Sequence, residues 1–531
     1  AKNIICKANK TINLKGKWIC PGFIDGHIHI ESSKLCPNEL AKALVPHGTT
    51  AIIADPHEIA NVSGTKGIDY MLEASKNLPM DIFFAIPSCV PATMFDESYE
   101  ILDAPKIKKY VHLPQVVGLA EVMNYVAVVN NEQWMLDKIK MFKDAGKTID
   151  GHAPGLTGKV LANYVSHGIE SDHECSTCAS ALEKLKLGQW IMIRNGSACH
   201  NLVDLLPIID KHSSKCMIVD DDKEPLDIIN CGHLDENIKI ALKHKKSLLK
   251  LIAMVTYNPA KYFHLHDLGM IKEGYKASFV IFDDLNKLSI KEVYHNGKCV
   301  YANNKLVKTK APALSKTKYH QIYHSINTKP ITLKDLRLNI KGKHQVNVID
   351  TIPGQVVTKK IVKTLNFDIN NGIDVKNDVL KIVVVERHKA TGHIGIAYIH
   401  GFGFKHGALA STVSHDSHNI IAIGSSDEDI LLAIKKIKQI NGGNVVVNNH
   451  KVVATLPLPI AGLMSDKDIH KVLADSRKVK EALDKLGVNK KLSPFMNMGF
   501  ISLPVIPDLK ITTNGLVDVT QFKIIDLIKK S

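Results

Sequence analysis

Arginine is scarce in this sequence, which limits what its strong positive charge can mean. Only four of the 68 basic residues are arginine, although the net charge at pH 7 is +15. Specific recognition of phosphates and bases favours arginine, because its planar fork donates two parallel hydrogen bonds. Dispersed lysines are typical of a solvated surface, so we predict no nucleic-acid partner.

Long apolar runs and targeting signals are missing as well. The sequence contains no uninterrupted apolar run of about 18 residues, so we predict no membrane span and no membrane partner. The first residues lack the three regions of a signal peptide, and the ten cysteines form no repeating framework. These features predict a cytoplasmic protein.

Cysteine-based metal sites are not indicated either. One Cys-x-x-Cys pair, Cys175 and Cys178, lacks the second pair that a structural zinc site would need. The run 172–175 does not meet the pattern of zinc nucleobase deaminases. We therefore interpret these cysteines as ordinary thiols.

Two histidines, His27 and His29, are the most informative residues that the sequence does contain. Side chains two residues apart on a strand point to the same face, so both imidazoles would enter one space. Two converging neutral imidazoles can bind a divalent metal ion. The alternative is a strand that carries two histidines without function.

Repeated alternation of apolar runs and amphipathic stretches predicts the fold of the first half of the chain. Eight short β-rich runs occur between about residues 20 and 262, with room for a helix after most of them. This number and size match a (β/α)8 TIM-type barrel. The predicted strands are residues 23–29, 51–55, 82–88, 116–121, 147–152, 168–173, 190–194 and 216–221.

The ends of these runs carry the chemistry. In a closed barrel, the carboxyl ends of all strands lie on one face, where the active site forms. A doubly wound sheet would not bring its first and last strands together in this way. Seven runs end on or beside a potential ligand or proton carrier: His29, Asp55, Glu121, His152, His173, Arg194 and Asp221.

Two further domains are predicted around the barrel at residues 21–262. Residues 1–20 and 263–310 are expected to form a small β-sandwich domain, part of which we expect to precede residue 1. Residues 308–329 read as a linker. Residues 330–531 are predicted to be an α+β domain, with strands at 380–386, 393–398, 420–423 and 445–447 and helices at 427–440 and 466–486.

Several longer motifs resemble the microbial adenine deaminase family of the amidohydrolase superfamily, and the resemblance spans nearly the whole chain. It departs from the family at Asp220, where relatives carry Thr, and at residues 276–278. The matching motifs are residues 21–33, 55–62, 118–124, 150–158 and 220–223 in the barrel, and 385–388, 415–419, 458–465 and 494–500 in the third region.

The resemblance implies a binuclear divalent metal centre, with manganese expected and iron or zinc as alternatives. Glu121 would bridge the two ions, at a position where many relatives carry a carbamylated lysine. Glu121 and Asp221 would be the catalytic residues, and Asp221 would handle the proton. The implied metal ligands are His27, His29, Glu121, His152, His173 and Asp221.

The implied reaction is the hydrolytic deamination of adenine to hypoxanthine and ammonia by a metal-activated bridging hydroxide, in purine salvage. The alternative is another amidohydrolase-type deaminase or cyclic amidohydrolase that acts on a different base; Glu121 argues against it, since those enzymes usually carry the lysine. A non-catalytic barrel would have lost at least one ligand, yet all six are present. The partner is expected to be a small purine base, and the chain to form a homo-oligomer.

Four residues are candidates for binding the purine edge: Glu31, His57, Glu58 and Arg194. Their structural alternatives are a helix cap for Glu31, a surface ion pair for Glu58 and a brace at the barrel mouth for Arg194. A histidine-rich run at 415–418 suggests either a separate metal site or a structural loop that covers a neighbouring barrel. We favour the structural role.

Overall fold

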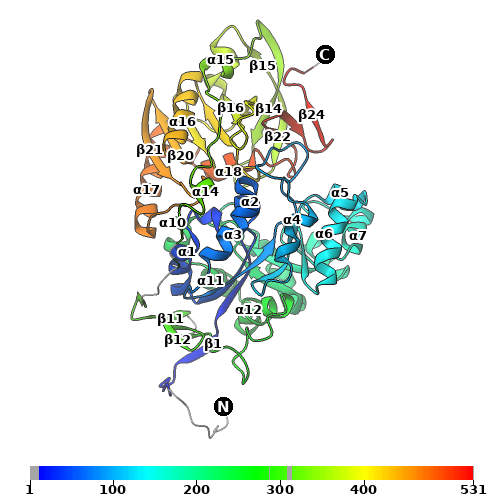
Figure 1. Ribbon diagram of the computed structural model, residues 1–531, viewed down its shortest axis with the longest axis vertical. Coiled ribbons are helices and arrows are strands. Elements are labelled where there is room, and N and C mark those ends of the chain that lie inside the picture. The colour runs from blue at the N-terminus through cyan, green and yellow to red at the C-terminus, as the bar shows by residue number, and fades with distance from the viewer. Residues whose placement is uncertain (1–10, 286, 308–311, 313, 530–531) are drawn as a thin grey trace.

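The structure is a computed structural model that describes residues 11–285, 287–307, 312 and 314–529. Figure 1 shows three parts along the long axis: a small sheet at the bottom, a barrel in the middle and a sheet-rich C-terminal region at the top. Among the described helices, none is both long enough and apolar enough to cross a membrane.

The barrel consists of parallel strands that alternate with helices, as predicted. Its strands are β2 (Phe23–Ile28), β3 (Thr49–Ala54), β4 (Asp81–Ile86), β5 (Val116–Val122), β6 (Thr148–Gly151), β7 (Ser171–Asp172), β8 (Trp190–Arg194) and β9 (Cys216–Val219). Its helices are α1 (Pro37–Leu44), α2 (His57–Ser63), α3 (Thr65–Ala74), α4 (Ala104–Ile107), α5 (Tyr125–Val129), α6 (Gln133–Asp144), α7 (Gly158–Ser166), α8 (Cys178–Lys186), α9 (Leu202–His212), α10 (Pro225–Asn230), α11 (Leu234–Lys243), α12 (Leu248–Met254) and α13 (Tyr257–Tyr262).

Backbone hydrogen bonds close the sheet into a barrel. The amide of Asp221 donates to His27 O over 3.0 Å, and the amide of His29 donates to Asp221 O over 3.3 Å, which joins the first strand to the last. Apolar side chains such as Ile24, Ile53 and Met217 fill the interior, because alternate residues of each strand point inward. The TIM-type barrel is therefore confirmed, and its closure brings the ends of β2 and β9 together.

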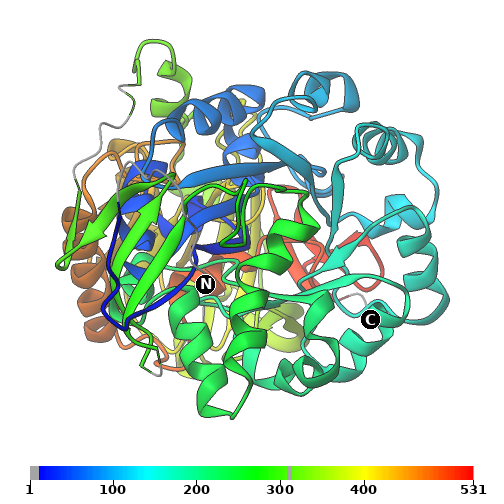
Figure 2. The same ribbon diagram turned by 90° about the horizontal axis from the view of Figure 1, so that it is seen from below.

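A five-stranded antiparallel sheet lies at the end of the barrel away from the C-terminal region (Figures 1 and 2). It joins one strand before the barrel to four after it: β1 (Trp18–Pro21), β10 (Phe279–Asp284), β11 (Ser289–His295), β12 (Lys298–Ala302) and β13 (Lys305–Leu306). Both flanks of the barrel segment thus contribute to one sheet. The predicted β-sandwich would need a second sheet packed against this one, and that part of the domain stays a prediction.

The C-terminal region is built on an eight-stranded mixed sheet with the order β15-β14-β17-β16-β19-β18-β20-β21. The strands are β14 (Lys343–Thr351), β15 (Thr358–Asn366), β16 (Val379–Val385), β17 (Ile394–His400), β18 (Ala408–Ser411), β19 (Ile420–Gly424), β20 (Gly443–Asn448) and β21 (Lys451–Pro457). Beside them lie α15 (Leu333–Leu336), α16 (Asp427–Gln439), α17 (Ile469–Leu486), α18 (Pro494–Phe500) and a small sheet of β22 (Leu509–Thr512), β23 (Gly515–Asp518) and β24 (Lys523–Ile525).

The C-terminal region is packed directly onto the barrel. The loop after β4 contacts it through Glu97, which accepts a hydrogen bond from Thr513 Oγ1 over 2.5 Å, and one apolar cluster joins Ala92 to Phe500. Within the predicted linker, α14 (His320–Tyr323) buries Ile322 completely. Part of this linker is therefore a packed element of the junction.

Candidate metal and active site

The predicted metal ligands come together at one end of the barrel, on the side that faces the C-terminal region. Each lies at or just after the end of a strand, as parallel strands in a barrel require. Their side chains are buried, with exposed fractions of 2–4%. These residues are His27, His29, Glu121, His152, His173 and Asp221.

Asp221 faces the two histidines of the first strand. Its Oδ1 atom lies 3.2 Å from His29 Nε2 and 3.4 Å from His27 Nε2. The neighbouring aspartates point elsewhere: Asp220 accepts a hydrogen bond from Lys223 over 3.0 Å, and Asp222 accepts one from Ser32. The backbone pairing of β2 with the residue after β9 therefore selects Asp221 from three consecutive aspartates.

Glu121 lies between the two histidine pairs. Its Oε1 atom is 3.5 Å from His29 Nε2, whereas Oε2 is 2.7 Å from His152 Nδ1 and 3.2 Å from His173 Nε2. One carboxylate thus contacts donors from β2, β6 and β7. This is the position that a ligand shared between two ions would occupy.

The donor set fits a divalent cation. Four imidazoles and two carboxylates converge, and such ligands suit manganese, iron or zinc. His27 Nε2 and His152 Nε2 are buried and have no hydrogen-bond partner among the described residues. A buried nitrogen without a partner is costly unless something binds it, and a metal ion would do so.

The charges of the carboxylates support this fit. Burial alone would raise the pKa of Glu121, but the adjacent histidines, above all His173, hold that pKa well below its usual range. Burial also opposes ionisation of Asp221, yet the adjacent His27 and His29 keep its pKa well below normal. Both carboxylates are therefore ionised, as metal ligands must be.

A second layer of hydrogen bonds holds the ligands in place. Asp25 accepts a hydrogen bond from the His27 amide over 3.2 Å and faces the buried His233, whose Nε2 also lies 3.1 Å from Asp220. On the other side, the hydroxyl of Tyr164 accepts the His152 amide over 3.0 Å. Such outer contacts fix ligand orientation and are part of a metal site.

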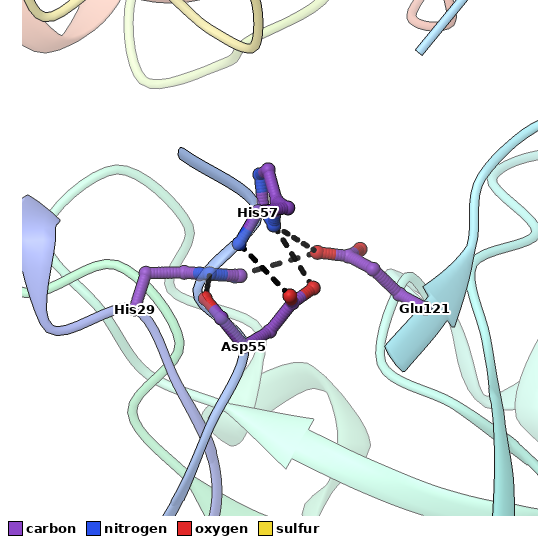
Figure 3. A group of neighbouring side chains, drawn as sticks. All are labelled: His29, Asp55, His57 and Glu121. Atoms are coloured by element: carbon purple, nitrogen blue, oxygen red, sulfur yellow. Dashed lines mark hydrogen bonds and ion pairs between the residues drawn. The ribbon is translucent and has the colours of Figure 1, made fainter. Parts of the chain in front are cut away.

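His57 lies next to the metal donors, at the start of α2 (Figure 3). Its Nδ1 atom is 2.9 Å from Asp55 Oδ2 and 3.7 Å from Glu121 Oε1, while its Nε2 atom is 3.5 Å from Asp416 Oδ1. Burial would lower the pKa of His57, but the charges of Asp55 and Asp416 raise it well above normal. His57 therefore links the metal donors to the C-terminal region.

The other predicted substrate-binding residues differ in position. Arg194 lines the cavity, where it donates to Asp221 Oδ2 over 2.8 Å and forms a two-pronged pair with Glu174. Glu31 and Glu58 are buried beside the cavity: Glu31 accepts the amide of Ile59, and Glu58 accepts the hydroxyl of Ser32. Ile59 lies in the first turn of α2, so Glu31 caps the start of that helix, as its structural alternative proposed, whereas Glu58 is buried and does not form a surface pair.

Some cavity residues were not predicted from the sequence. Glu174 directly follows a predicted ligand, and its position at a strand end was a signal that could have identified it. The other unpredicted barrel residues are Met123, Cys199 and Asp222, and Asp222 directly follows a predicted ligand. The rest lie hundreds of residues from the barrel donors, so no spacing along the chain places them in this cavity, although His415 and Asp416 belong to the histidine-rich run noted in the sequence. Those from the C-terminal region are Val356, His415, Asp416, Phe500, Leu503 and Ile506.

The run 415–418 covers the barrel of its own chain. His415 Nδ1 and His418 Nε2 lie 3.5 and 3.9 Å from the two oxygens of Glu58, so the three side chains could be taken for a metal site. However, His418 Nδ1 accepts a hydrogen bond from the Ser414 amide over 3.1 Å. The neutral ring then carries its proton on Nε2, which leaves no lone pair there for a metal.

Comparison with known protein families gives a match for each half of the chain. Residues 18–300 match the Amidohydrolase family, and residues 355–523 match the Adenine deaminase C-terminal domain. The first match covers the barrel and most of the small sheet, and the second covers most of the C-terminal region. The amidohydrolase match implies a divalent metal centre, in agreement with the donor set.

Curated relatives match nearly the whole chain. It is 44% identical over 519 residues to Adenine deaminase 2 of Carboxydothermus hydrogenoformans, covering 97% of this chain and 90% of that protein. Adenine deaminase of Dehalococcoides mccartyi is 43% identical over 525 residues, with 97% and 90% covered. That of Halalkalibacterium halodurans is 40% identical over 525 residues, with 98% and 89% covered. This chain therefore belongs to the amidohydrolase family and, within it, to the adenine deaminases.

Proposed function

We propose that this protein hydrolytically deaminates adenine to hypoxanthine and ammonia, as a step in purine salvage. The observation that carries this proposal is the similarity to adenine deaminases, at 44% identity over 97% of the chain. A match of this length spans both the barrel and the C-terminal region. A barrel match alone would support only the wider family.

A pair of divalent ions, manganese first and iron or zinc as alternatives, is the proposed cofactor. His27, His29 and Asp221 would hold one ion, His152 and His173 the other, and Glu121 would contact both. When bound, such ions lower the pKa of a coordinated water towards neutrality and so supply a nucleophile at working pH. The contacts of Glu121 with both histidine pairs support this division.

Asp221 is the proposed proton carrier. Its Oδ1 atom faces His27 and His29, and its Oδ2 atom accepts a hydrogen bond from Arg194 over 2.8 Å. It would take the proton of the attacking water and deliver it to the amino nitrogen on C6, which leaves as ammonia. Arg194 would hold the carboxylate in place during both transfers.

The purine edge needs donors, because ring nitrogens gain negative charge during attack at C6. We propose that His57 and Arg194, which line the cavity, contact the base directly. Glu31 and Glu58 would support them from the layer beside the cavity, and Glu58 also lies 3.5 Å from His415.

The remaining expectations concern the setting of the enzyme. Scattered free cysteines favour a reducing compartment, so we propose a cytoplasmic enzyme. We further propose a homo-oligomer without nucleic-acid or membrane partners. Sedimentation of the purified protein with and without duplex DNA tests the assembly and the absence of that partner.

Ammonia release from a panel of free bases and cyclic amides tests the activity. The protein is loaded separately with manganese, iron and zinc, and the products are identified by chromatography. Formation of equal amounts of hypoxanthine and ammonia from adenine would support the proposal. Turnover of another base or a cyclic amide, with adenine untouched, would show a different member of the amidohydrolase family.

A further inference from the structure

The cavity at the candidate site has two chemically different walls. The barrel wall carries the metal donors, His57 and Arg194, whereas the facing wall comes from the C-terminal region and is mostly aromatic or aliphatic. The cavity between them is narrow, at about 30 Å³, so a purine base that binds there lies against both walls.

An aromatic pair forms the centre of this second wall. The rings of His415 and Phe500 lie 4.3 Å apart between centroids and 10° from parallel, and both are buried. Two stacked rings present a flat surface, and flat heteroaromatic molecules prefer such surfaces. A nucleobase has this shape, whereas a sugar or a peptide does not.

The same wall carries polar atoms that have nothing to bind. Asp416 Oδ2 and His415 Nε2 are buried and lack a hydrogen-bond partner within the described part of the chain. Asp416 is 2% exposed, and its other oxygen lies 3.5 Å from His57 Nε2. A buried acceptor without a donor costs free energy, so a ligand that donates to Asp416 would stabilise this arrangement.

Hydrogen bonds join the two segments of the wall into one unit. Ser502 Oγ donates to His415 O over 2.9 Å and lies 2.5 Å from Ser414 Oγ. Arg387, fully buried, donates from Nε to His418 O. The loop that carries Asp416 and the helix that carries Phe500 are therefore held together before any ligand binds.

From this arrangement we propose that His415, Asp416 and Phe500 are the base-recognition residues, with Asp416 accepting a hydrogen bond from the N–H of the five-membered ring. This inference rests on the proposed function and specifies how that site reads its substrate. A free purine carries this N–H, and a nucleoside carries its sugar there instead. The C-terminal region therefore selects free bases over nucleosides.

A site built to accept a substrate N–H rejects the analogue that lacks it, because the buried acceptor stays unpaired. Titration calorimetry on the metal-loaded enzyme with hypoxanthine and 9-methylhypoxanthine tests this without turnover. Asp416→Asn should weaken hypoxanthine binding about 10- to 100-fold, the effect of one hydrogen bond to a charged group. Binding of 9-methylhypoxanthine, which lacks the N–H, should change less than about threefold.

Phe500→Leu should weaken the binding of both purines to a similar degree, by about 3- to 10-fold, because stacking does not depend on the N–H. Asp350→Asn and Phe367→Leu are matched controls in the C-terminal region, since neither residue lines the cavity. Metal content should match the wild type in the two cavity variants, and circular dichroism should show that both are folded.

Equal weakening of both purines by Asp416→Asn would overturn the inference, because it would show that Asp416 acts only by positioning His57. Unchanged binding in that variant or in Phe500→Leu would overturn it as well. The proposed function has its own readout in the same preparations: an inactive wild type that binds no purine would overturn both proposals. An active wild type with an unchanged KM in Asp416→Asn would overturn this inference alone.

Discussion

The barrel and the C-terminal region use buried charge in opposite ways. In the barrel, buried acids and bases face one another, as Glu121 faces His152 over 2.7 Å. In the C-terminal region, buried cations mainly bind backbone carbonyls: Arg387 donates to His418 O and Ala461 O, and Lys510 donates to Val356 O and Phe500 O. The charged pairs of the barrel form the candidate metal and active site, whereas the buried cations of the C-terminal region hold the backbone of loops in place.

The two arrangements meet at the cavity. Val356 and Phe500, whose carbonyls bind Lys510, both line it, and the loop held by Arg387 carries Asp416. Burying a cation costs free energy unless hydrogen bonds satisfy it, so these cations hold their loops only in the packed state. The comparison predicts that barrel variants lose metal and chemistry, whereas C-terminal variants lose stability and substrate binding.

The largest effect is expected for Glu121→Gln. Loss of one charge between the histidine pairs should release metal and lower adenine turnover by about a thousandfold or more, since metal activation supplies several kcal/mol. Metal analysis and ammonia release measure both, and circular dichroism should show an unchanged fold. Full metal content and wild-type turnover in this variant would contradict the prediction that barrel variants lose metal and activity.

Arg387→Met should be the most destabilising change in the C-terminal region. It leaves buried carbonyls unpaired, so the free energy of unfolding should fall by about 2–4 kcal/mol. Calorimetry measures this, with the exposed Arg477→Met as a matched control. Metal content should stay unchanged because Arg387 contacts no metal donor; a loss of metal would contradict the division between the two regions.

Lys510 should make stability depend on pH. Burial lowers the pKa of Lys510 to about 7, from 10.5, with only Asp508 opposing. Above about pH 7 the unfolded chain therefore binds more protons than the folded one, and wild-type stability should rise with pH, by on the order of 2 kcal/mol up to pH 9. Lys510→Met should lack this rise. Parallel melting curves for the two proteins across that range would refute the assignment.

The smallest effect is expected for an exposed pair on the outside of the barrel. Lys140 and Asp144 of α6 lie 2.5 Å apart, but their side chains are 73% and 61% exposed. Water screens such pairs, so Lys140→Ala should change stability by less than about 0.5 kcal/mol. A larger change in the melting transition would show that surface charge matters as much as buried charge here.

Local sequence patterns were sufficient to predict most strands of the barrel. Strands of parallel sheets are short apolar runs, and the predicted runs overlap β2–β9, although β7 is only Ser171–Asp172 where residues 168–173 were expected. The helix predicted at 427–440 is α16, Asp427–Gln439. These elements are visible because their burial imposes a pattern on neighbouring residues.

Two strands of the C-terminal sheet, the edge strand β15 and the inner strand β18, were not visible in this way. Most residues of β15 are exposed or only partly buried, and three of its nine residues are lysines, which suits a sheet edge but resembles a polar stretch in the sequence. β18, Ala408–Ser411, is too short and too rich in small residues to stand out. β18 is defined by its pairing with β19 and β20 rather than by a pattern of its own.

By itself, the sequence determined the barrel and its donors, because a histidine spacing of two and a polar residue at each strand end are local consequences of strand geometry. Tertiary structure alone decided which residues cover these donors. Asp416 and Phe500 reach the cavity only through the docking of a second region onto the barrel. Such contacts depend on surfaces that match in space, and no spacing along the chain encodes them.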